Sequence, residues 1–378
     1  MDNVVSNQNK FNVYVFLSTF ARNLIEVFIP LILFKFGYSL KETLFYYLLS
    51  NIFSVIICYP FIVVAKKYNN KVLAIIGILA FVLIQFLLNN MVDSIFYLVL
   101  LALLYAIYRR GYWISRRFYN MKIMTTKNIS KTYSVISVVN QIGVICSAYI
   151  GSLILDFVGI KTLTCISISL FLLSIVPLFF LKFQYPKNNT KLSLMKTLKK
   201  IPLSNIFLLG TYEVTTVVKL FFSLYIFIYV KNTYQTIGGL NLVTGLSVCI
   251  FTYLYGKKIN GKKNFLRLSI LLTIGLYFLK ANVTSYFLVV ICFLEGIVNK
   301  MHEISISKES YALSNKFEYN NYNLAYEMIQ NVFRTVIVLV LLIFVDDLKL
   351  MIYITLGIMS LGILMNFKKT NLRNYKVK

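Results

Sequence analysis

Residues 65–90 read AKKYNNKVLAIIGILAFVLIQFLLNN, a short basic turn followed by an apolar run whose only polar side chains are Gln85, Asn89 and Asn90. A helix needs about 20 apolar residues to cross the hydrocarbon core of a bilayer, and this run is long enough. The turn before it carries three lysines and no acidic residue. Basic residues beside an apolar span are typical of the cytoplasmic side of a membrane. The stretch therefore predicts a transmembrane helix that begins at the cytoplasmic surface.

The same pattern recurs along the whole chain of 378 residues, which is 58% hydrophobic and only 14% charged. A soluble chain is about a quarter charged, so this composition excludes a water-soluble globular enzyme. The net charge of +26 lies between apolar runs rather than on one soluble face, so we expect no nucleic-acid partner. The twelve apolar runs that predict membrane spans are residues 11–36, 44–65, 72–90, 94–108, 134–155, 162–181, 204–230, 238–256, 265–280, 283–299, 323–345 and 350–366.

The distribution of basic residues predicts the orientation of these spans. With the N-terminus inside, thirty of the 39 Lys and Arg fall in the predicted cytoplasmic connections, and only six, among them Lys280, fall on the opposite side. This asymmetry predicts a multi-pass protein of the plasma membrane with both termini in the cytoplasm. The arginines at 109–110 and 116–117 are expected to end the fourth span at the lipid surface, and His302 is expected at the same interface.

An internal repeat predicts the domain organisation. AKKYNNK at 65–71 returns as GKKINGK at 256–262, with the basic pairs 191 residues apart. The motif FYLV at 96–99 returns as YFLV at 286–289, 190 residues later. Both offsets are close to half the chain length, so two halves of six helices are expected. The halves comprise residues 1–181 and 204–378, joined by a cytoplasmic linker at 182–203.

With these features the chain resembles the major facilitator superfamily over essentially its whole length. In that family the loop after the second span of each half follows an approximate G-x-x-x-D-R-x-G-R-K pattern, of which K-K-x-N-x-K remains here without the acid. The resemblance implies an all-helical membrane fold in which spans one, four, seven and ten line a central cavity. It also implies gating at the two basic loops, whose lysines are Lys66, Lys67, Lys71, Lys257, Lys258 and Lys262.

Charged residues within the first span are candidates for function because charges are costly in a bilayer. Arg22 and Glu26 are four residues apart and so share one helical face. One interpretation is a self-neutralising ion pair. The other is that Glu26 carries a proton while Arg22 tunes it or contacts the substrate. Pro30, one turn further on, removes a backbone hydrogen bond and favours a bend in this helix.

Four further residues complete the predicted substrate and proton pathway. Glu213 and Lys219 lie on the seventh span about 120° apart around the helix, so they need not touch. Glu295 is the acid of the tenth span, and its counterpart 190 residues earlier is Tyr105 on the fourth. By the family resemblance, these spans line the cavity.

Polar side chains on two other spans allow two interpretations. Glu327, Gln330 and Arg334, together with Asn331, form a stripe on the eleventh span, and Asn140 and Gln141 occupy a comparable place on the fifth. They either hydrogen-bond between helices as polar glue or contribute to the transport path.

Small residues on the fifth span, Gly143, Ser147 and Gly151, recur at four-residue spacing. That spacing predicts close packing against another helix.

The function predicted from these residues is secondary active transport with proton coupling and alternating access, and export of a small amphipathic or peptide-like compound. Three cavity acids against two bases leave one net negative charge, which favours a neutral or cationic substrate. The alternatives are an uptake permease of the same fold, or a non-transporting membrane receptor, assembly factor or immunity protein. We expect a monomer in the bilayer without cofactor. The chain has neither a phosphate-binding loop for ATP nor a clustered catalytic group, so it is not expected to be an enzyme.

Overall fold

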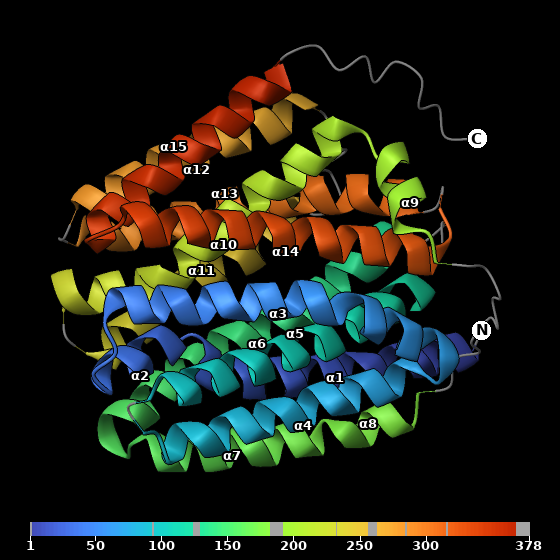
Figure 1. Ribbon diagram of the computed structural model, residues 1–378, viewed down its shortest axis with the longest axis horizontal. Helices are drawn as coiled ribbons and strands as arrows, with labels where there is room; N and C mark the ends of the chain where they lie inside the picture. Colours follow the sequence, from blue (N-terminus) through green and yellow to red (C-terminus); the bar gives the residue numbers. More distant parts are fainter. Residues whose placement is uncertain are drawn as a thin grey trace.

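The computed structural model describes residues 2–92, 94–123, 129–181, 192–231, 233–255, 263–283, 286–314 and 317–367. Within these ranges all regular secondary structure is helical (Figure 1). The helices are α1 (Asp2–Glu26), α2 (Ile29–Lys35), α3 (Leu40–Lys67), α4 (Asn70–Asn89), α5 (Ile95–Ile123), α6 (Ile129–Phe157), α7 (Ile160–Leu173), α8 (Ile175–Phe179), α9 (Leu194–Lys200), α10 (Leu203–Tyr229), α11 (Tyr234–Tyr255), α12 (Lys263–Asn282), α13 (Phe287–Ser314), α14 (Tyr319–Phe344) and α15 (Leu348–Phe367). The second basic loop, with Lys257, Lys258 and Lys262, lies outside the described residues.

Nine helical segments in the described part of the chain are long and apolar enough to cross a membrane. They correspond to the first eight predicted spans and the eleventh. Two shorter apolar helices, Leu268–Asn282 and Leu348–Ser360, match the ninth and twelfth predicted spans. The tenth predicted span is the first part of α13. These segments support a multi-pass membrane protein.

Breaks next to prolines divide two of the spans, and the first of these prolines, Pro30, was expected to bend its helix. Pro30 occupies the first turn of α2, directly after the break that follows Glu26. Proline has no N–H to donate and its ring clashes with the carbonyl four residues earlier, so the helix breaks on the N-terminal side of the ring. Pro177 lies within α8 in the same way, four residues after α7 ends at Leu173. Each broken segment still continues in roughly one direction (Figure 1).

Local capping explains the reversal that precedes α3. The backbone N–H of Ser39 donates to Glu42 Oε2 at 2.7 Å, and the Glu42 N–H donates to Ser39 Oγ at 3.2 Å. This capping box satisfies backbone donors that would otherwise have no partner at the helix start. Gly37 has a φ of 97° just before it, a conformation that residues with a side chain rarely adopt.

Small residues allow the closest helix contacts. A Cβ on Gly111 of α5 would lie 2.4 Å from the Leu73 carbonyl oxygen of α4. A Cβ on Gly151 of α6 would lie 2.7 Å from the Leu24 carbonyl oxygen of α1, and one on Gly143 would lie 3.4 Å from the Phe16 carbonyl oxygen. The prediction of close packing from the fifth-span spacing is therefore confirmed. Without glycine at 111 or 151 the helix axes would have to separate, whereas a Cβ at 143 would make an ordinary contact.

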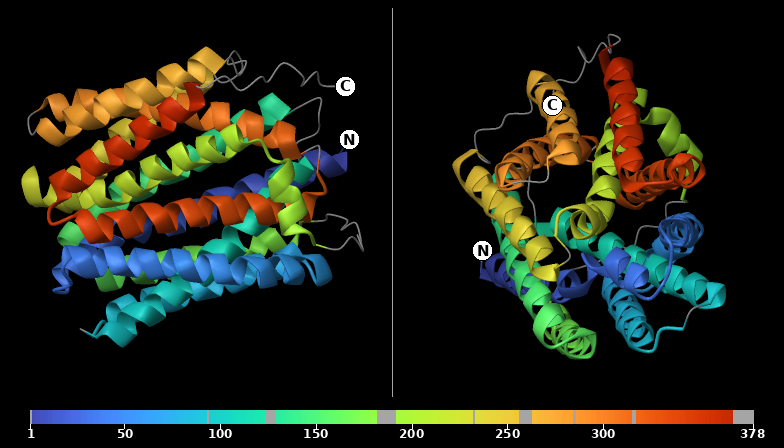
Figure 2. Two further views of the ribbon diagram at one scale, coloured as in Figure 1. Left: turned by 45° about the horizontal axis from the view of Figure 1, so that its top comes forward. Right: turned by 90° about the vertical axis from the view of Figure 1, so that its left-hand side faces the viewer.

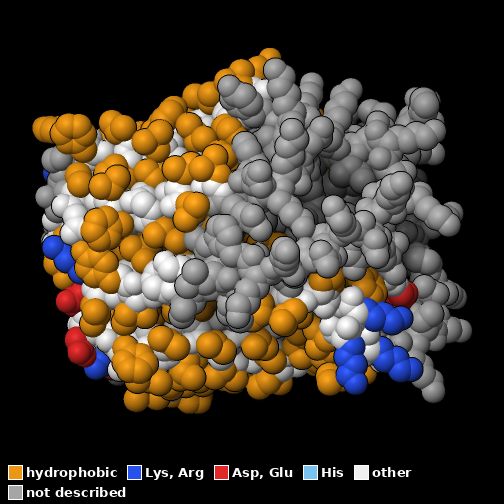
Figure 3. All heavy atoms as spheres, turned by 90° about the horizontal axis from the view of Figure 1, so that it is seen from above, with side chains coloured by type: hydrophobic (Ala, Val, Ile, Leu, Met, Phe, Trp, Pro, Cys, Tyr) orange, Lys and Arg blue, Asp and Glu red, His pale blue; other side chains and the backbone are white. Residues whose placement is uncertain are grey.

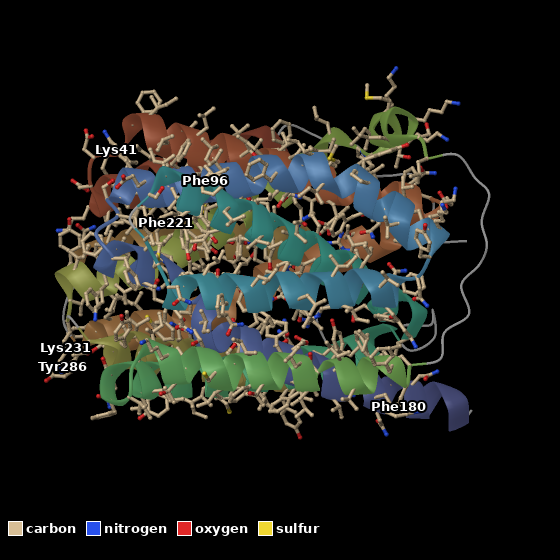
Figure 4. All side chains as sticks on the ribbon, turned by 60° about the horizontal axis from the view of Figure 1, so that its bottom comes forward. Lys41, Phe96, Phe180, Phe221, Lys231 and Tyr286 are labelled. Atoms are coloured by element: carbon tan, nitrogen blue, oxygen red, sulfur yellow. The ribbon has the colours of Figure 1, made fainter. Side chains whose placement is uncertain are left out.

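The helices before residue 181 and those after 203 gather on opposite sides of the molecule (Figure 2). The strongest packing between these two parts is that of α3 against α14 and of α6 against α11. At one end of the bundle, Lys41 Nζ of α3 lies 3.0 Å from Asp346 Oδ1, which follows α14. Lys41 and Lys231 mark this end, and Phe180 marks the other (Figure 4).

The lateral surface of the bundle is apolar. On the face shown in Figure 3, hydrophobic side chains cover most of the described surface between the two ends. Lys, Arg, Asp and Glu side chains of the described residues gather at the ends. This distribution is the one a bilayer requires, with charges in the aqueous interfaces and hydrocarbon around the middle.

Candidate functional site

A cavity of about 590 Å³ lies between the two groups of helices. Side chains from α1, α3, α5, α6, α10, α11, α13 and α14 line it, and α12 contributes Lys280. The lining includes the residues predicted for the pathway and the polar stripes except Glu213 and Asn331, which are both fully buried. The residues concerned are Arg22, Glu26, Tyr105, Asn140, Gln141, Lys219, Glu295, Glu327, Gln330 and Arg334.

The predicted pair on α1 forms in the structure. Arg22 Nε lies 3.0 Å from Glu26 Oε2, and Tyr105 Oη of α5 donates to Glu26 Oε1 at 2.8 Å. The guanidinium of Arg22 also packs over the rings of Tyr112 and Trp113, at 5.4 and 5.2 Å from their centroids. Aromatic faces attract a cation, so the arginine is held by both a carboxylate and a ring pair. This arrangement tethers the charged pair of α1 to α5.

Glu213 and Lys219 of α10 separate as the helical spacing predicts. Glu213 is fully buried, accepts a hydrogen bond from Gln330 Nε2 at 2.7 Å and forms an ion pair with Arg334 of α14. Lys219 points into the cavity and its side chain is exposed there. Among the described residues, no acidic group lies within ion-pair distance of its ammonium.

Glu295 of α13 lies at the centre of a buried network. It forms an ion pair with Lys280 of α12 and accepts hydrogen bonds from Tyr277 Oη at 2.9 Å and from Asn299 Nδ2 at 3.1 Å. The prediction that Lys280 lies at the outer surface was wrong, since its exposed fraction is 4%. The helix α12 continues to Asn282, so Lys280 remains inside the bundle and faces α13.

The arginines of α5 occupy the cavity wall instead of the lipid surface, and that prediction was wrong as well. The exposed fractions of Arg109, Arg110 and Arg116 are 8%, 1% and 6%. The helix α5 runs on to Ile123, well past the predicted end of the fourth span. The seven-residue spacing from 109 to 116, and from 110 to 117, places each pair on one inward face.

A three-residue ion cluster joins α5 to α14. Glu327 forms ion pairs with both Arg110 and Arg117, and the Arg117 Nη1 atom lies 2.7 Å from Glu327 Oε1. Arg117 also donates to Asn323 Oδ1 at 2.9 Å. The predicted stripe on α14 therefore divides its charges: Glu327 pairs with α5 and Arg334 with α10.

The first-half partners of this stripe bind one arginine. Arg116 donates to Asn140 Oδ1 of α6 at 2.7 Å and to Tyr112 Oη at 2.6 Å. Gln141 lines the same wall beside Gly245 of α11, where a Cβ would lie 3.2 Å from Gln141 Nε2. The polar residues of α6 thus contact both the cavity and neighbouring helices.

One other expectation, the solvated position of His302, is overturned by the structure. His302 was expected at the solvated interface, but α13 continues to Ser314 and buries it to an exposed fraction of 1%, with Nε2 3.4 Å from Thr211 Oγ1. In the first basic loop, Lys71 Nζ donates to the Phe179 carbonyl oxygen at 2.9 Å, and Lys67 lies over the Tyr68 ring beside Lys66. Lys71 therefore ties α4 to α8, within the part of the chain before residue 181.

The charge of the cavity differs in sign from the value that the sequence predicted. The predicted set of five charged residues is net negative, whereas the structure adds five arginines and two lysines and only two acids to the lining. Nine cationic side chains face four carboxylates there; the cations are Arg22, Arg109, Arg110, Arg116, Arg117, Lys219, Lys280, Lys300 and Arg334, and the acids are Glu26, Glu295, Glu303 and Glu327. Burying charge inside a membrane protein is costly, so this cationic surplus makes the cavity the candidate functional site.

A bundle of apolar helices around a charged internal cavity defines a membrane protein of the transporter class. The family model described as "Major Facilitator Superfamily" matches residues 11–307. The chain therefore belongs to the major facilitator superfamily, and it is a transporter, not an enzyme. A search of curated protein sequences finds no match.

Three solved structures illustrate the similarity of fold. The human organic anion transporter MFSD10 (TETRAN) aligns with a TM-score of 0.69 at 12% identity, covering 96% of this chain and 99% of its own. A point mutant of the nucleoside transporter NupG aligns with a TM-score of 0.71 at 14% identity, covering 96% and 100%. FucP in the outward conformation aligns with a TM-score of 0.67 at 14% identity, covering 97% and 100%. At these identities the likeness shows the fold alone.

Proposed function

We propose that this chain is a secondary active transporter that carries a small organic anion by alternating access. The observation that carries the proposal is the cationic surplus of the cavity, nine basic side chains against four carboxylates. A water-filled cleft with low-dielectric walls concentrates ions of the opposite charge. An anion would therefore be attracted to this cavity, and a cationic compound would be repelled from it.

The proposed membrane arrangement follows the sequence prediction. We propose twelve spans, of which α12, the first part of α13 and α15 supply the three that are shorter or more polar. Two six-helix halves, 1–181 and 204–378, rock about the cavity, with the linker 182–203 and both termini on the cytoplasmic side of the plasma membrane. The transporter acts as a monomer in this proposal.

Proton coupling is proposed at Glu26. Its side chain is 17% exposed, compared with 5% for Glu295 and 0% for Glu213, so it is the pathway acid most open to the cavity. Glu26 and an incoming anion compete for Arg22, which lies 3.0 Å from the carboxylate. Protonation of Glu26 releases Arg22 for the anion, so proton and anion binding favour each other.

This linkage favours one direction of transport. Two ligands that favour each other's binding cross the membrane together, so the inward proton gradient drives the anion inward. The Arg22–Glu26 pair thus supports the uptake alternative, whereas the sequence predicted export.

The test is transport in proteoliposomes with an imposed pH gradient and an internal pH dye. We expect carboxylates to dissipate the gradient, and choline and sugars to leave it unchanged. Arg116→Gln should abolish the response, whereas Lys41→Gln, at an exposed position outside the cavity, should not. Glu26→Gln should retain anion exchange but lose proton movement. Movement of cations or sugars instead would refute the anion proposal, and no transport by folded protein would support a receptor, assembly or immunity role.

A further inference from the structure

Three cations of the cavity differ from the other six in having no acidic partner among the described residues. Arg22, Arg110, Arg117, Lys280, Lys300 and Arg334 each form an ion pair with a glutamate. Arg109, Arg116 and Lys219 line the same cavity, and no carboxylate of the described residues lies within 4.0 Å of them. A cation kept at membrane depth without an acid is costly unless a ligand or water balances it. These three side chains are therefore available to an anion before protonation of Glu26 releases Arg22.

Two of the three lie on one helix and are already oriented. Arg109 Nη1 donates to Asn51 Oδ1 of α3 at 2.9 Å, and Arg116 is held by Asn140 and Tyr112. These partners are neutral, so they fix the direction of each guanidinium but do not cancel its charge. An arginine has five N–H donors in a planar fork, so donors remain for a carboxylate. We call Arg109 and Arg116 the guanidinium pole.

The third cation lies on the other part of the chain. Lys219 belongs to α10, beyond residue 203, whereas α5 precedes residue 181. Its ammonium makes no hydrogen bond to a described residue and its side chain is exposed to the cavity. Lys219 is therefore a second pole, on a different wall from the first.

We propose that the cargo carries two anionic groups, one bound by the guanidinium pole of α5 and the other by Lys219 of α10. This inference rests on the proposed transport of an organic anion and specifies its class as a dicarboxylate. A monocarboxylate can neutralise only one wall and leaves the other cation without a counter-charge when the cavity closes. A dicarboxylate neutralises both walls and holds the two parts of the transporter together around it.

The chain carries its own reporter for binding at the guanidinium pole. Trp113 is the only tryptophan in the sequence, it lines the cavity, and the Arg116 guanidinium lies 5.3 Å from its ring centroid. An anion that binds Arg116 changes the field at the indole. Tryptophan fluorescence of the purified full-length protein therefore measures binding without transport, and isothermal titration calorimetry provides a second measurement.

The experiment compares dicarboxylates of four to eight carbons with monocarboxylates of the same length. We expect at least one dicarboxylate to bind ten times more tightly than its monocarboxylate counterpart. Lys219→Gln should remove that advantage and leave monocarboxylate affinity unchanged, whereas Arg116→Gln should weaken both at least tenfold. The matched control is Lys231→Gln, the same change at an exposed lysine just beyond α10. It should alter neither the monocarboxylate nor the dicarboxylate affinity.

The outcomes separate this inference from the proposed function. Equal affinity for mono- and dicarboxylates, or an equal loss of both in Lys219→Gln, would overturn the second pole and leave anion binding intact. If folded wild-type protein binds no carboxylate by either method, both this inference and the proposed function fail.

Discussion

The ion cluster between α5 and α14 gives a stability prediction that depends on burial. Glu327 is 1% exposed and is the acidic partner of both Arg110, also 1% exposed, and Arg117, 19% exposed. Glu327→Gln keeps the size and one acceptor oxygen of the side chain but removes the charge. Two guanidinium groups, one of them fully buried, then lack an acid.

The expected loss of stability in Glu327→Gln is large. Removing one partner of a buried ion pair costs about 3–5 kcal/mol because the remaining charge is left uncompensated in a low dielectric. The amide still accepts one hydrogen bond, so we expect the free energy of unfolding to fall by about 3 kcal/mol, the lower end of that range. Replacing all three charged side chains by apolar ones, with Glu327→Leu, Arg110→Met and Arg117→Met, should recover most of this loss, because no charge then remains unpaired.

The matched control is the ion pair at the other end of the bundle. Lys41 and Asp346 also join a helix of the first part to a segment of the second, but their side chains are 58% and 85% exposed. Asp346→Asn should lower the free energy of unfolding by about 0–1 kcal/mol, because solvent screens an exposed pair. Equilibrium unfolding in detergent, followed by circular dichroism, compares the two. A loss in Glu327→Gln no larger than in Asp346→Asn would refute the claim that the cluster is a desolvated unit.

Three other substitutions test local features by the same unfolding assay. Gly111→Ala should lower the free energy of unfolding by about 1–3 kcal/mol, because the new Cβ would lie 2.4 Å from the Leu73 carbonyl oxygen and α4 and α5 would have to move apart. The control is Gly275→Ala, where no atom lies within 4 Å of the new Cβ, so this change should be neutral or stabilising. Ser39→Ala removes the capping box of α3 and should cost about 1 kcal/mol; no loss would mean that the cap is replaced by water. Asp156 of α6 accepts from two backbone N–H groups in the first turn of α11, at 3.3 and 2.8 Å. Asp156→Asn should therefore lower the free energy of unfolding by about 0.3–1 kcal/mol, and by less at high salt. A loss of stability that does not depend on salt would contradict the charge argument.

Features set by local spacing could be predicted from the sequence. The apolar runs that predicted spans recur as helices, and the four-residue spacing of Arg22 and Glu26 brings their charged atoms to 3.0 Å. The six-residue spacing of Glu213 and Lys219 likewise separates them, one into a buried pair and the other into the cavity. Helical geometry alone decides these cases, because both members lie on one helix.

Contacts between distant helices could not be predicted in this way. Arg110 and Glu327 are 217 residues apart, and nothing in either local sequence indicates the other. The misplaced Arg110, Lys280 and His302 share one cause: α5, α12 and α13 continue beyond the predicted ends, so residues assigned to an interface remain inside. The seven-residue repeat of the arginine pairs was the available signal for an inward face, since lipid-facing interface residues need no such spacing.

The positive charge of the cavity affects the cost of breaking the ion cluster between α5 and α14. Separating the two parts of the chain at this cluster would pull Arg110 and Arg117 away from Glu327, and the buried Arg110 would then face a cavity with five more cations than acids. An anion held at Arg109 and Arg116, on the same helix, supplies the negative charge that the departing glutamate removes. The cargo would then lower the cost of breaking the cluster, whereas an empty cavity would raise it. Under the anion proposal, this transporter would resist opening without its anion and would need no acid in its basic loops to do so.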